Sequence, residues 1–197
     1  LAVVLVSITC AIIGTFVVLR GLAFLGDALG HAVFPGVVIA YLLNANLLVG
    51  GLAAGLLTTA GISIATRNRR IKESTAIGIF YTVAFALGAL LLSRSQSSAR
   101  GLSELLLGNV LAVRQQDLVL TALVAGAVLL VVALLYKELV LVSFDPALAA
   151  AQGRNVALID ALLFALLTLA IVAALQTVGN VLVVALLIVP AATGRLV

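Results

Sequence analysis

Charged residues are scarce in this sequence. Asp, Glu, Lys and Arg make up 9% of its 197 residues, whereas about a quarter of the residues in a soluble domain are charged. Residues 1–19, 74–93 and 118–136 contain no charge at all, and between Asp27 and Arg67 the one side chain that titrates near neutral pH is His31. Each gap can hold one or two helices of about 20 apolar residues, so the scarcity excludes a soluble globular protein and predicts an integral membrane protein.

Other residue types are missing as well. Tryptophan and methionine are absent, and Cys10 is the single cysteine, which excludes a disulfide scaffold within the chain. The alternating ten-residue strands of a transmembrane barrel are also lacking, because the apolar runs are continuous. Glycine is plentiful, at 17 residues, and small residues let membrane helices pack closely. The predicted fold class is an all-α integral membrane protein.

The apolar segments predict a polytopic bundle of about seven spans. They cover 1–19, 22–43, 47–66, 74–93, 118–136, 157–178 and 180–197. The connection RNRRIKE at 67–73 carries four of the eleven Lys and Arg residues, which places it in the cytoplasm by the positive-inside rule. The apolar piece 102–113 would reach only about 18 Å as a helix, too little to cross about 30 Å of hydrocarbon. We therefore expect it to form an outer half-helix.

The domain organisation is simple. The sequence has no soluble second domain, so a single transmembrane domain over 1–197 is expected. The basic residues lie in short connections between spans, where they report orientation and do not indicate nucleic-acid binding. Because the chain begins and ends within apolar stretches and contains no methionine, we expect a fragment truncated at both ends.

Asp27 and His31 are candidate metal ligands. Their spacing of i and i+4 puts them on one face of a helix, about one turn apart. An aspartate within the membrane costs on the order of 3 kcal/mol, so its presence suggests a function. A carboxylate and an imidazole suit zinc, manganese or ferrous iron, although two ligands are too few for such an ion. A second copy of the chain or water must then complete the site, unless the pair only fixes helix packing.

Pro35 and Gly36 predict a helix break beside these residues. Proline at position 35 cannot donate a hydrogen bond to the carbonyl of His31, so the helix should kink or open there. The carbonyl freed in this way is a possible third ligand.

A short helix is expected in the connection 137–156. Asp145 can cap the start of this helix, Pro146 suits its first turn and Gly153 suits its end. The topology above places it on the cytoplasmic face.

The sequence resembles a known family in several successive segments. GLAFLGDALGHAVFPGVVIAYLL resembles the signature helix of the ABC-type zinc, manganese and iron importer permeases. The resemblance continues through KESTAIGIFYTVAFALGALLLS, LLLGNVLAV, KELVLVSFDPALAAAQG and TVGNVLVVALLIVPAATGRLV, in the family's order. Asp27 and His31 match the family's intramembrane metal-binding positions. The family's ATPase-coupling helix is matched by Ser143, Phe144, Asp145, Pro146, Ala147, Leu148 and Gly153.

The resemblance implies an importer that works by alternating access. Expected partners are a cytoplasmic ATP-binding subunit, an extracytoplasmic metal-binding protein, a second permease copy forming a homodimer, and the lipid bilayer of a prokaryotic cell membrane. The zinc, manganese or iron ion would be cargo, with no permanently bound cofactor. The chain itself is not expected to be an enzyme, because it lacks the GxxxxGK[ST] loop of ATPases.

Two other functions remain open. An intramembrane Asp and His pair also suits a proton-coupled secondary transporter, which would have no use for an ATPase-coupling helix. An ABC permease for an iron chelate or a corrinoid would share the arrangement of spans, but a bulky cargo does not call for Asp27 and His31 on one face. An intramembrane hydrolase is disfavoured, since the sequence contains no HExxH or GxSxG motif.

Overall fold

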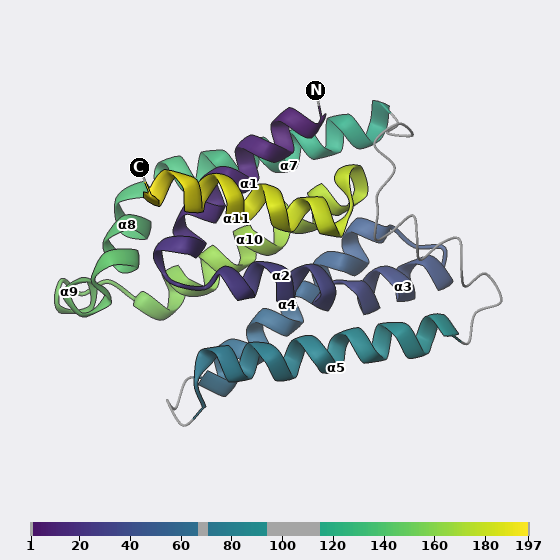
Figure 1. Cartoon of the computed structure of the whole chain (residues 1–197), viewed down its shortest axis with the longest axis horizontal. Coiled ribbons are helices and arrows are strands. Elements are labelled where there is room, and N and C mark those ends of the chain that lie inside the picture. Colours follow the sequence, from purple (N-terminus) through teal and green to yellow (C-terminus); the bar gives the residue numbers. More distant parts are fainter. Residues whose placement is uncertain (1, 67–70, 94–114, 197) are drawn as a thin grey trace.

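The computed structural model describes residues 2–66, 71–93 and 115–196, and helices dominate all three ranges (Figure 1). The helices are α1 (Ala2–Leu19), α2 (Ala23–Ala32), α3 (Phe34–Leu42), α4 (Leu47–Thr66), α5 (Glu73–Ser93), α7 (Gln115–Leu134), α8 (Tyr136–Phe144), α9 (Pro146–Ala151), α10 (Val156–Val178) and α11 (Asn180–Leu196). The all-α prediction is confirmed. The predicted half-helix at 102–113 and the basic residues of 67–70 lie outside the described residues.

Five helices of the described part are long and apolar enough to cross a membrane, or six if a bent pair counts as one span. The segment Ala23–Leu42, which comprises α2 and α3, counts as one of the five. Each of the predicted apolar segments is helical, but the apolar stretch of α11, Leu182–Gly194, is shorter than a full span. The chain is thus a multi-pass membrane protein, close to the expected number of spans.

The connection after α7 differs from the sequence prediction. Residues 118–134 are followed by a bend of 69°, after which α8 runs from Tyr136 to Phe144. We expected only one short helix in this connection, so α8 is a correction. Its sequence, YKELVLVSF, carries two charges, yet Leu139 and Val142 are buried. A helix with an apolar stripe and a polar remainder can pack along the end of the bundle.

The inner helices are α10 and the α2–α3 pair. The buried share of the most apolar stretch of each span is 67% for Ala23–Leu42 and 56% for Val156–Leu175. For Ser74–Ser93 of α5 the buried share is 22%. Figure 1 shows α5 along one edge of the bundle and α10 in its interior. The helix that carries Asp27 and His31 is therefore mostly surrounded by protein.

Two glycines allow the backbones of neighbouring helices to approach closely. A Cβ atom added to Gly36 on α3 would overlap the carbonyl oxygen of Gly50 on α4, and one added to Gly14 on α1 would overlap the carbonyl of Leu187 on α11. Such close approach of backbones is how membrane helices associate when lipid is as apolar as their side chains.

A tight turn joins α1 to α2. Gly21 has a φ of 70°, its N–H donates to the carbonyl of Val18, and the N–H of Leu22 donates to the carbonyl of Val17 at 2.9 Å. This is the Schellman arrangement, which ends a helix with a left-handed residue that glycine adopts without strain. The start of α2 is thereby fixed directly to the end of α1.

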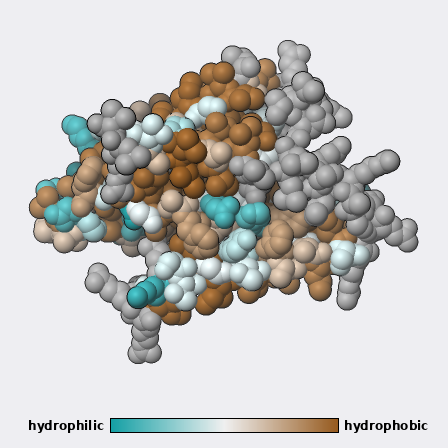
Figure 2. Space-filling model, in the orientation of Figure 1, coloured by the Kyte–Doolittle hydropathy of each residue, from teal (hydrophilic) through white to brown (hydrophobic). Residues whose placement is uncertain are grey.

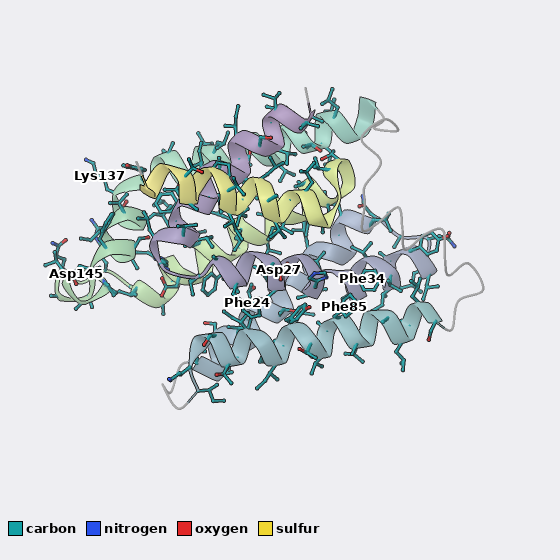
Figure 3. The ribbon with its side chains drawn as sticks, viewed as in Figure 1. Phe24, Asp27, Phe34, Phe85, Lys137 and Asp145 are labelled. Atoms are coloured by element: carbon teal, nitrogen blue, oxygen red, sulfur yellow. The ribbon has the colours of Figure 1, made fainter. Side chains whose placement is uncertain are left out.

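The short helix α9 forms as the sequence predicts. The N–H of Leu148 donates to Oδ1 of Asp145 at 2.9 Å, Pro146 occupies the first turn, and Gly153 follows the helix with a φ of 77°. Phe144 and Leu148 are 70% and 46% exposed. Figure 3 shows Asp145 at one end of the bundle, with Lys137 near it.

Candidate metal transport site

Asp27 and His31 lie together on α2, as their spacing predicts. Oδ1 of Asp27 is 3.7 Å from Nε2 of His31, and the side chains are 42% and 25% exposed, respectively. Their neighbours along the helix, among them Ala28, Leu29 and Gly30, are buried. In Figure 2 a hydrophilic patch lies over α2 in the middle of a largely apolar face. The pair is thus accessible from outside the described bundle.

Aromatic rings from α5 surround the imidazole of His31. Its ring centroid lies 5.4 Å from that of Tyr81 and 5.3 Å from that of Phe85. Phe24 contacts Tyr81, and Phe34 contacts Phe85, with centroid distances of 6.4 and 5.8 Å. Figure 3 shows Phe24 and Phe85 in the space between α2 and α5. These rings restrict the orientations open to the imidazole.

Sequence reasoning did not identify this aromatic frame. Tyr81 and Phe85 are spaced i and i+4, which places both on one face of α5. That spacing was the available signal, but it does not reveal which helix the face contacts. Only the packing of α5 against α2, visible in the ring contacts, links these residues to His31.

The ligand set is incomplete within the described residues. No group of three or more His, Cys, Asp or Glu side chains that could hold a metal ion occurs there. The pair of Asp27 and His31 therefore supplies two donors, and an ion that prefers four to six ligands needs others. The contribution of water or a second copy of the chain stays a prediction.

The helix interruption lies just before Pro35. α2 ends at Ala32 and α3 begins at Phe34, while Val33 keeps helical torsion angles of −68° and −26°. A backbone N–H at this end of α2 bonds to the carbonyl of His31. One lone pair of that oxygen is therefore used, and its role as a third ligand stays a prediction. Gly36 contributes close packing against Gly50.

The predicted coupling residues lie at the end of the bundle formed by α8 and α9 (Figure 1). Ser143 is at the end of α8 and accepts a hydrogen bond from Nε of Arg20 at 3.1 Å. Glu138 on α8 and Arg154 after α9 form an ion pair at 3.4 Å. The segment 143–153 thus projects the exposed side chains of Phe144 and Leu148 outward at this end of the bundle.

A sequence model of the ABC 3 transport family matches residues 1–197. The chain belongs to the ABC 3 transport family. Among curated relatives of this family member is the "Manganese transport system membrane protein MntC" of Halalkalibacterium halodurans, 49% identical over 195 residues, which are 99% of this chain and 67% of the relative. The "Manganese import system permease protein ScaB" of Streptococcus parasanguinis is 44% identical over 97% of this chain and 68% of its own length.

Other similar proteins widen the range of metals named. The "Probable iron transport system membrane protein" of Haemophilus influenzae is 37% identical over 98% of this chain and 71% of its own length. A solved structure, "PsaBC from Streptococcus pneumoniae in complex with Fab", is similar with a TM-score of 0.87 and 41% sequence identity. The match covers 99% of this chain and 70% of that one. The resemblance noted from the sequence is thereby confirmed, as is a place in the bacterial plasma membrane for this ABC 3 family chain.

Proposed function

We propose that this chain is the membrane-spanning permease subunit of an ABC transporter that imports a divalent transition metal ion, with manganese as the first candidate cargo. The observation that carries the proposal is the pair of Asp27 and His31, whose oxygen and nitrogen face each other at 3.7 Å on a helix that is otherwise mostly buried. Manganese is the first candidate because several relatives are named as manganese transport proteins, while one is named as a probable iron transport protein.

The distance within the pair suits shared binding of one ion. An ion about 2.1 Å from each atom would span that separation at an angle of roughly 120°. Ionised Asp27 and neutral His31 provide a hard oxygen and a borderline nitrogen, which manganese, iron and zinc all accept. The remaining positions would be filled by water or by a second permease copy. With water in the remaining positions, only two protein donors would hold the ion, so that it could be released again during transport.

The transport cycle that we propose is alternating access. An extracytoplasmic metal-binding protein delivers the ion, which rests at Asp27 and His31 while the outer path closes. A separate cytoplasmic ATP-binding subunit supplies the energy, because this chain contains no GxxxxGK[ST] loop. Its movement reaches the spans through α9 and the exposed side chains of Phe144 and Leu148. Two copies of the permease would face each other across the path.

Metal uptake by metal-starved cells tests this proposal. The cells would carry the full-length permease with its ATPase and binding protein, as wild type, Asp27→Asn or His31→Ala at matched membrane abundance. We expect both variants to lose uptake of the same ion by at least about tenfold, because Asp27→Asn removes the negative charge of one donor and His31→Ala removes the other donor. Thr15→Val is the control, since Thr15 is an exposed membrane residue whose hydroxyl donates to the carbonyl of Ala11 in its own helix at 2.9 Å.

Two results would contradict the proposal. Wild-type uptake by both Asp27→Asn and His31→Ala would mean that the pair serves helix packing alone. Failure of an excess of free manganese, iron or zinc to compete with the transported cargo in wild-type cells would favour an iron chelate or corrinoid as that cargo.

A further inference from the structure

Arg20 joins three helices at the end of the bundle where α8 and α9 lie. It ends the last turn of α1, its Nε donates to Oγ of Ser143 on α8 at 3.1 Å, and its Nη1 forms an ion pair with Oδ1 of Asp160 on α10. The Ser143 hydroxyl in turn donates to the carbonyl of Leu139 at 2.6 Å. The Arg20 side chain is only 10% exposed. One guanidinium therefore ties α8 to the spans.

The burial of Arg20 is hard to explain by stability alone. Arg20 is the buried partner of its ion pair, whereas the Asp160 side chain is 35% exposed. The hydration that a buried guanidinium loses offsets much of the attraction to its carboxylate. Nη2 of Arg20 is buried without a hydrogen-bond partner within the described residues, which adds a further cost. The contact to Ser143 therefore points to a role beyond packing.

Arg20 is also fixed to the helix that carries the candidate site. The turn that follows it is closed by the hydrogen bond from Leu22 to Val17, and α2 begins at Ala23. Asp27 comes four positions after Ala23, about 6 Å along the axis of α2 from its start. On the other side, Ser143 lies two positions before Asp145, the residue that caps α9. The contact between Arg20 and Ser143 therefore adds a polar link between α1 and α8 to their apolar packing, in which the rings of Phe16 and Tyr136 lie 6.4 Å apart, centroid to centroid.

We propose that Arg20 is a positioning residue that transmits movement of α8 and α9 to α2, so that ATP-driven displacement of the coupling segment reaches Asp27 and His31. This inference rests on the proposed function. The guanidinium suits the task because its planar, rigid fork holds two acceptors in fixed directions. A lysine ammonium is a single flexible point charge, which can pair with Asp160 but cannot hold Ser143 in the same way.

The test compares Mn²⁺ uptake with ATP hydrolysis in the same proteoliposomes. These would contain the full-length permease, its ATPase and its binding protein. For both Arg20→Lys and Ser143→Ala we expect ATP hydrolysis to continue while the number of ions taken up per ATP falls at least about tenfold, the size of one lost charge-assisted hydrogen bond. The double variant should be no worse than either single variant, since all three remove the same contact.

Arg154→Lys is the matched control. Arg154 lies at the same end of the molecule and also pairs with a carboxylate, but its side chain is 53% exposed. Such exposed pairs contribute little, so the uptake per ATP should equal that of wild type.

Three results would overturn the inference: a wild-type ratio in Arg20→Lys, additive effects in the double variant, or a parallel loss of uptake and hydrolysis that leaves the ratio unchanged. The last would show that Arg20 serves assembly only. Failure of the proposed function looks different, because wild-type proteoliposomes would then take up no Mn²⁺, or Asp27→Asn would take up as much as wild type.

Discussion

The imidazole of His31 lies edge-on to the ring of Phe85, with centroids 5.3 Å apart and planes at 85° to each other. Edge-to-face geometry is the favoured arrangement of two aromatic rings. Because His31 is on α2 and Phe85 on α5, the orientation of a candidate metal ligand depends on packing against a second helix. The site is therefore assembled by helix packing as well as by the spacing of its two polar residues.

Shortening Phe85 should weaken transport without removing a ligand. In Phe85→Ala we expect metal uptake to fall about two- to tenfold, because an aromatic pair contributes about 0.5–1.5 kcal/mol beyond its buried area and the imidazole gains rotational freedom. The measurement is the initial rate of uptake at limiting metal concentration, normalised to permease abundance. Leu87→Ala is the control, since Leu87 lies on the same helix and is 52% exposed. Equal rates for the two variants would show that the aromatic frame does not position His31.

The sequence predicted the helices well because the membrane imposes a strong signal on them. Long apolar runs such as 1–19 and 157–178 can satisfy their backbone polar groups only as helices, and the structure agrees within a few residues. Capping residues act locally as well, so the start of α9 could be predicted correctly from Asp145 and Pro146. By contrast, α8 was missed, because its charged residues and the adjacent Asp145 and Pro146 resembled a connector.

The rest of the site depends on contacts between residues far apart in the sequence. The pairing of Asp27 with His31 follows from helix geometry, so the sequence alone was sufficient. The contact of His31 with Phe85 requires knowing which face of α5 meets α2. Arg20 and Asp160 are 140 positions apart, and no local pattern connects them. Such contacts are decided by tertiary packing, which leaves no short periodic pattern in a single sequence.

The close contact between α3 and α4 makes Gly36 sensitive to substitution. In Gly36→Ala the added methyl group would overlap the Gly50 carbonyl and lie 2.5 Å from Cβ of Ala54, so the helices must separate. Overpacking of this kind typically costs about 1–3 kcal/mol. We expect the thermal unfolding midpoint of the purified protein in detergent to fall by several degrees.

Gly78→Ala provides the matched comparison for that substitution. A Cβ atom added at Gly78, on α5, would meet nothing within 4 Å, and alanine favours a helix over glycine by about 1 kcal/mol. Its unfolding midpoint should therefore equal or exceed that of wild type. A midpoint for Gly36→Ala as high as that of Gly78→Ala would show that α3 and α4 are less closely packed than the structure has them.

The hydrogen bond that caps α9 allows a test of whether this helix contributes to binding of the ATPase subunit. Asp145→Ala removes the acceptor for the N–H of Leu148, which should cost about 1 kcal/mol of local helix stability. Asp145→Asn keeps an acceptor and should behave like wild type. We expect weaker retention of the ATPase subunit on the purified alanine variant, measured by co-purification at matched permease amounts. Equal loss in both variants would mean that the carboxylate charge, and not the helix cap, matters for binding.

Tyr81 separates two roles that an aromatic residue beside a metal site can have. Its ring lies 5.4 Å from that of His31, centroid to centroid, and a hydroxyl is not needed for this contact. Tyr81→Phe should therefore transport metal at the wild-type rate, whereas Tyr81→Ala should lose activity to a similar extent as Phe85→Ala, because each removes one of the two α5 rings that hold the imidazole. The check is the dependence of uptake rate on metal concentration for both variants. A marked rise in the concentration needed for half-maximal uptake in Tyr81→Phe would instead identify the hydroxyl as a metal contact, and the donor count of the site would then increase by one.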